Sequence, residues 1–136
     1  MKSEMTFSRT LQSLEKIFEF IGTFTSKAHI EKSEIFPIEL AVEELFTNMV
    51  KYQRDSLQDI AITLEKAGPK LTVTLIDPDC EPFDVLKKPE PEINQPLQER
   101  KLGGLGVYLT KKMVDVMDYQ YANRKSTITL TKNFEG

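Results

Sequence analysis

The stretch Glu99–Asp115 reads ERKLGGLGVYLTKKMVD and holds half of the six glycines of the chain, at positions 103, 104 and 106. Glycines at this spacing allow a backbone to approach a ligand closely. The apolar residues that follow recur at helical spacing, at Leu105, Leu109, Met113 and Val116. The pattern predicts a glycine turn that leads into a helix N-terminus, whose free N–H groups and positive dipole end suit a phosphate. A tight loop in which glycine only permits close packing explains the same residues equally well.

The composition of the chain limits what the domain can be. Its 136 residues, 40% hydrophobic and 29% charged, predict a single domain over residues 1–136. The net charge of −3 argues against direct binding to nucleic acid, because a protein that binds nucleic acid usually has a basic face. One cysteine and one histidine exclude an internal disulfide and a Cys/His zinc site. No apolar run approaches the roughly 20 residues of a membrane span, so we expect a soluble, cytoplasmic protein without a membrane partner.

Two amphipathic helices are predicted in the first 52 residues. The first runs from about Ser8 to Lys27 and buries Leu11, Leu14, Phe18, Ile21 and Phe24. The second is capped by Ser33, tolerates Pro37 near its start, and runs from Ile38 to Tyr52. Its buried stripe comprises Ile38, Val42, Leu45, Phe46, Met49 and Val50.

Glu44 and Asn48 lie one turn apart on this second helix, away from the centre of its apolar stripe. An ordinary solvated helix face explains such a pair. A functional interpretation makes the carboxylate a general base and the amide an oxygen ligand for Mg²⁺, a cation that takes a few protein oxygens together with water and phosphate. The spacing alone leaves both interpretations open.

The rest of the chain predicts two hairpins and one long connection. Asp59–Lys66 and Lys70–Asp77 alternate apolar and polar residues around a Gly-Pro turn, as an antiparallel hairpin does. Val85–Leu102 is charged and proline-rich without periodicity, which is typical of a lid, a binding loop or a disordered insert. Tyr119–Asn123 and Thr127–Thr131 predict a closing hairpin, so the expected order is α-α-β-β-loop-α-β-β.

Three stretches, in this order, resemble the small ATP-binding domains of the GHKL (histidine-kinase-like) class, and specifically the bacterial anti-sigma-factor serine kinases. They are Leu40–Asn48, Pro82–Asp84 and Glu99–Val107, and the similarity continues through Val114-Asp115 to Thr127–Lys132. It covers roughly residues 7 to 134, nearly the whole chain. Each motif is weak alone, but their order and spacing within one short domain are specific.

The resemblance implies an α/β (α+β) sandwich of the GHKL or Bergerat type, with helices on one face of a mixed, mostly antiparallel sheet. ATP and Mg²⁺ would lie between the helix layer and a mobile loop. In that family the residue matched by Glu44 is catalytic and activates a hydroxyl, and the amide matched by Asn48 binds Mg²⁺. The residues that the resemblance assigns to nucleotide binding are Asn48, Asp77, Asp79, Arg100, Gly103, Gly104, Leu105, Gly106, Val107 and Thr129.

One departure from the family pattern falls on the adenine contact. The family usually shows Asp-x-Gly just before Pro-Phe-Asp, and the aspartate accepts a hydrogen bond from the adenine amino group. Here the aspartate position holds Pro78 and the glycine position holds Cys80. The flanking carboxylates are Asp77 and Asp79, and Asp77 is the preferred candidate because it directly ends an apolar strand.

The leading hypothesis is therefore an ATP-binding anti-sigma protein that is also a protein serine kinase. It would bind a sigma factor in one state and phosphorylate a small STAS-type antagonist in another, and homodimers occur in the family. The alternative is a partner-binding module on the same fold with little nucleotide chemistry, which Pro78 and Cys80 favour. A dinucleotide-binding oxidoreductase fits poorly, since the glycines do not follow the first strand of a βαβ unit.

Overall fold

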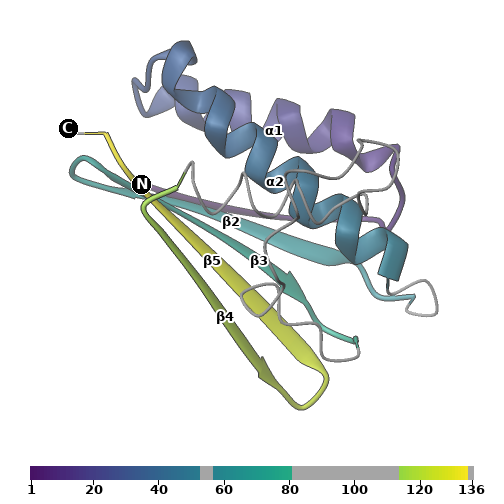
Figure 1. Cartoon of the computed structure of the whole chain (residues 1–136). Helices are drawn as coiled ribbons and strands as arrows, with labels where there is room; N and C mark the ends of the chain where they lie inside the picture. Colours follow the sequence, from purple (N-terminus) through teal and green to yellow (C-terminus); the bar gives the residue numbers. More distant parts are fainter. Residues whose placement is uncertain (53–56, 81–113, 135–136) are drawn as a thin grey trace, which may run out of the picture.

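Two helices lie over one face of a five-stranded sheet in the computed structural model, which describes residues 1–52, 57–80 and 114–134 (Figure 1). The strand order is β1-β2-β3-β5-β4, and all four of these pairings are antiparallel. The predicted α/β fold with helices on one face of a mostly antiparallel sheet is confirmed. The described elements are β1 (Lys2–Phe7), α1 (Ser13–Lys27), α2 (Lys32–Tyr52), β2 (Ile60–Ala67), β3 (Lys70–Asp77), β4 (Val116–Ala122) and β5 (Lys125–Asn133).

The hydrophobic core lies between the two helices and the sheet. The stripe predicted for α2 is buried from Ile38 to Met49, and Val50 packs partly against the core. Alternate residues of the three central strands face the same core, as a strand with one covered face requires. The strand side chains of this core are Ile60, Ile62, Leu64, Leu71, Val73, Leu75, Ile128 and Leu130.

Helix α2 begins earlier than the sequence pattern indicated. Ser33, predicted as its cap, is the second residue of the helix, and Pro37 lies inside it. Proline has no N–H to donate to the carbonyl of Ser33 four residues before it. Ser33 is exposed, so water can reach the region of this carbonyl, and the proline is tolerated within the early turns.

The N-terminal segment differs from the prediction in two ways. Residues Lys2–Phe7 form the edge strand β1, paired with β2 from Lys2↔Glu65 to Phe7↔Ile60. The sequence did not indicate it, because most of its side chains are exposed and only Phe7 is buried. Helix α1 starts at Ser13 rather than Ser8, so Leu11 lies outside it and is 47% exposed.

The closing hairpin is longer and turns more tightly than predicted. Asn123 and Arg124 alone join β4 to β5, both with positive φ (54° and 64°), as a two-residue hairpin turn demands. Ser126, expected in the turn, is therefore a strand residue. Val116, expected on the helix after the glycines, begins β4 and is 55% exposed. The predictions of a lid over Val85–Leu102 and of the glycine-led helix otherwise fall outside the described residues.

Candidate functional site

Helix α2 carries the first two residues of the candidate site. Glu44 is half-buried, and Asn48, one turn later, is only 3% exposed. The Nδ2 atom of Asn48 is buried and has no hydrogen-bond partner within the described part of the chain. A buried polar group without a partner is unfavourable by roughly 1–3 kcal/mol, so an acceptor supplied by a ligand would offset this cost. The neighbouring Met49 belongs to the hydrophobic core.

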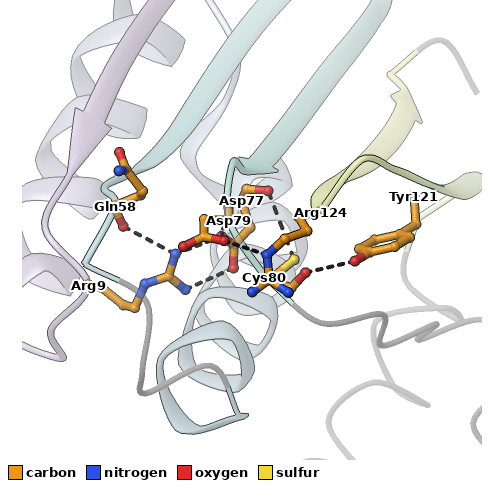
Figure 2. A network of polar contacts seen from close by, with 7 residues as sticks. All are labelled: Arg9, Gln58, Asp77, Asp79, Cys80, Tyr121 and Arg124. Carbon is orange, nitrogen blue, oxygen red and sulfur yellow. Dashed lines mark hydrogen bonds and ion pairs between the residues drawn. The ribbon is translucent and has the colours of Figure 1, made fainter.

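Asp77, the last residue of β3, is 1% exposed and forms a two-point ion pair with Arg9 (Figure 2). Arg9 Nη1 donates to Asp77 Oδ2 at 2.8 Å, and Nη2 donates to Asp77 Oδ1 at 2.6 Å. Arg9 lies in the connection between β1 and α1, and its side chain is 6% exposed. Nη2 also donates to the carbonyl of Gln58 at 3.1 Å. The guanidinium thus joins three segments that are distant in sequence.

Asp79, the second acidic candidate, lies at the solvent edge of this network. Its Oδ1 accepts a hydrogen bond from Arg124 Nε at 2.7 Å, and the two side chains are 41% and 54% exposed. Its backbone N–H donates to Asp77 Oδ1 at 3.3 Å. Each of the two predicted carboxylates is therefore bonded to an arginine of this chain (Figure 2).

Asp77–Cys80 form a short acidic turn at the end of β3, and Cys80 fixes the end of this turn to the closing hairpin. Its backbone N–H donates to the carbonyl of Arg124 at 2.9 Å, and its carbonyl accepts a hydrogen bond from the Tyr121 hydroxyl at 2.8 Å. The side chain is buried, and this burial, followed by the negative charge of Asp77, raises the pKa of the Cys80 thiol to about 11. The thiol is therefore neutral near pH 7.

Ser126 is a buried polar residue that the sequence analysis missed. It lies directly opposite Asp77 in the β3–β5 register and is 6% exposed. Assigning it to a turn hid the alternation that places Ser126, Ile128 and Leu130 on the helix-covered face. Thr129, which the resemblance assigned to nucleotide binding, points to the opposite face of the sheet, between Thr74 and Asp118. Thr129 and Asp77 therefore lie on opposite faces of the sheet.

Six predicted nucleotide-binding residues lie outside the described residues. They are Arg100, Gly103, Gly104, Leu105, Gly106 and Val107. Their assignment remains a prediction from the sequence. The segment resumes at Val114, which is buried in the core, and at Asp115, whose N–H donates to the Thr131 carbonyl at 2.9 Å.

Comparison with known proteins decides the family. The model of the histidine kinase-like ATPase domain matches residues 7–132 of the chain. The chain belongs to this family. The match confirms the resemblance to histidine-kinase-like ATP-binding domains that the motifs indicated. None of the curated proteins matches the chain significantly.

Two solved structures share the fold of this histidine kinase-like ATPase domain. The structure of the RsbU and RsbW domains of Rv1364c from Mycobacterium tuberculosis aligns with a TM-score of 0.71 at 15% identity, over 98% of this chain and 32% of that one. The histidine kinase AdeS of Acinetobacter baumannii aligns with a TM-score of 0.57 at 13% identity, over 98% of this chain and 68% of that one. The chain thus spans about a third of the first protein. Neither helix of the described structure is long and apolar enough to cross a membrane.

Proposed function

We propose that this domain is an ATP-binding anti-sigma regulatory protein and protein serine kinase. The observation that carries the proposal is the pair on α2: Glu44 stands one turn before Asn48, whose buried amide nitrogen has no partner within the described residues. In a domain of the histidine kinase-like ATPase family, this pair fits a phosphoryl-transfer site. A carboxylate and an amide on one helix ridge can serve proton transfer and metal binding respectively.

Each residue would have a distinct task in that reaction. Asn48 would hold a Mg²⁺ ion through its side-chain oxygen, and the ion would supply positive charge to the phosphates of ATP. Glu44 would accept the proton of the attacking serine hydroxyl as the bond from its oxygen to the γ-phosphorus forms and ADP leaves. Arg100 and the glycine turn 103–106 would bind the phosphates.

The proposed partners are a sigma factor and a STAS-type antagonist protein, which would be the phosphate acceptor. They follow from the resemblance of the motifs to anti-sigma serine kinases, and the fold shared with the RsbU and RsbW domain structure is consistent with them. A homodimer and a cytoplasmic location belong to the same proposal.

A second candidate function is a partner-binding module with weak nucleotide binding. The observation that favours it is that the carboxylates of the acidic turn are already bonded to arginines: both oxygens of Asp77 accept from Arg9, and Asp79 accepts from Arg124. Pro78 and Cys80 also replace the residues that the family pattern expects. Such a module would bind its partner without transferring phosphate to it.

Calorimetric titration distinguishes the two candidates. The kinase proposal expects micromolar binding of Mg-ATP to the purified chain, whereas no heat at millimolar nucleotide would support the module. Asn48→Ala should weaken Mg-ATP binding far more than binding of ATP in excess EDTA, because the amide acts through the metal. Gln120→Ala, on the exposed edge strand β4, is the matched control. Equal binding of both forms of ATP by wild type and Asn48→Ala would refute the metal-ligand role.

A further inference from the structure

Both carboxylate oxygens of Asp77 accept hydrogen bonds from groups of the protein itself. Its Oδ2 accepts from Arg9 Nη1, and its Oδ1 accepts from both Arg9 Nη2 and the N–H of Asp79. The carboxylate is 1% exposed and the guanidinium is 6% exposed. A planar guanidinium that meets a carboxylate at two points fixes the geometry of both groups.

Among the described residues 78–80 that follow Asp77, no side chain is well placed to read an adenine base in its stead. Asp79 faces solvent and accepts from Arg124. Pro78 has no side-chain acceptor, and the buried thiol of Cys80 is a weak hydrogen-bonding group. The adenine amino group is a donor, so it requires a free acceptor at this position. In the described turn, both carboxylates are instead already bonded to arginines of this chain.

The ion pair also resists displacement by a base. Separating Arg9 from Asp77 would leave two buried charges without compensation, whereas the amino group of adenine is a single neutral donor. Arg9 is further retained by its bond to the carbonyl of Gln58. A bound nucleotide therefore gains too little from Asp77 to break the pair.

We propose that Arg9 is a specificity-determining residue: it withholds Asp77 from the base, so nucleoside triphosphates bind with little preference for adenine over guanine. The inference rests on the proposed nucleotide site and concerns only its selectivity. Arg9 acts through Asp77 and is a positioning residue.

The test is the ratio of the dissociation constants for Mg-GTP and Mg-ATP, measured by calorimetry on the full chain. Wild type should give a ratio within about threefold of one. Asp77→Asn should leave this ratio unchanged. Arg9→Met, which removes the guanidinium but retains an unbranched apolar chain, should free the carboxylate and raise the preference for ATP by roughly 10- to 150-fold, the value of one hydrogen bond to a charged group.

Two further variants make the result specific. The double variant Arg9→Met with Asp77→Asn should return the ratio to the wild-type value. Lys27→Met, which removes an exposed cation at the end of α1, is the control and should not change the ratio. The wild-type ratio itself needs no substitution, so the test remains decisive if Arg9→Met does not fold.

Three outcomes would overturn the inference or the function beneath it. A wild-type preference for ATP of about tenfold or more that Asp77→Asn abolishes would show that Asp77 reads the base despite Arg9. If wild type binds neither nucleotide, the proposed function fails. In that case ATP binding gained by Arg9→Met would still support the inference, and continued absence of binding would refute it.

Discussion

Removing Arg9 should destabilise the domain far more than removing the arginine of the exposed ion pair. In the Arg9→Met variant the Asp77 side chain, 1% exposed, loses its counter-charge and two hydrogen bonds of 2.6 and 2.8 Å. Breaking a buried pair by removing one partner costs about 3–5 kcal/mol, because it leaves a buried charge uncompensated. Whole domains are stable by roughly 5–15 kcal/mol, so the variant should lose a large fraction of its stability.

The exposed pair provides the matched comparison. Arg124 and Asp79 form a contact of similar length, 2.7 Å, but their side chains are 54% and 41% exposed. Exposed pairs contribute about 0–1 kcal/mol, so Arg124→Met should change the free energy of unfolding by no more than this. The two substitutions are chemically identical, but the Arg9 pair is buried, bonded at two points and held by a further bond to the Gln58 carbonyl, whereas the Arg124 pair is exposed.

Urea unfolding of both variants, followed by circular dichroism, measures the difference. Adding Asp77→Asn to Arg9→Met should recover part of the lost stability, because the uncompensated charge is then removed. If Arg9→Met lowers the free energy of unfolding by no more than Arg124→Met does, the Arg9–Asp77 pair does not behave as a buried, desolvated ion pair. If the double variant is less stable than Arg9→Met, the loss comes from packing of the Arg9 side chain rather than from the unpaired carboxylate.

Two other predictions concern catalysis and pH. Glu44→Ala should lower phosphoryl transfer to an acceptor by roughly 10²- to 10⁴-fold while leaving ATP affinity within several-fold, because a general base acts on the hydroxyl and not on the nucleotide. A kinase assay measures the transfer and calorimetry measures the binding. Equal losses of transfer and binding would indicate a structural role for Glu44. Burial raises the pKa of the Cys80 thiol from 9.0 to about 11, so the folded state favours the neutral thiol. The stability that this thiol contributes is fully present below pH 9 and should be lost as the pH rises toward 11. Cys80→Ala should reduce this dependence in urea unfolding measured between pH 8 and about pH 11, and an unchanged profile would contradict the assignment.

The helices and the central hairpin could be predicted because their side chains alternate between a covered and an uncovered side. The stripe from Ile38 to Met49 and the two strands that end at Ala67 and Asp77 follow this rule closely. The edge strand β1 does not, because pairing with β2 rather than burial forms it. Its exposed side chains leave no periodic signal in the sequence.

The polar site was harder to predict than the fold. The sequence indicated Glu44, Asn48 and Asp77 as residues of interest, but not that Arg9 would bond to Asp77 from 68 positions away. Such a pairing depends on how the β1–α1 connection passes the end of β3, which no local pattern encodes. Ser126 was missed for a related reason: the predicted turn ended at Ser126, two residues after the observed turn of Asn123 and Arg124, and so left Ser126 off the strand that faces Asp77.

The order of strands in the sheet also bears on how the chain reaches its native state. The β2–β3 and β4–β5 hairpins close over short turns and can form early, whereas β3 and β5 pair in register only after the chain between Asp77 and Ser126 has folded back. This seam and the β1–β2 pairing are the two non-local pairings of the sheet, with partners 49 to 63 and 53 to 63 positions apart, and loop-closure entropy opposes both until the contacts form. The joining of the two hairpins, at the edge of the same polar network that holds Asp77, is therefore expected to be one of the slow steps of folding.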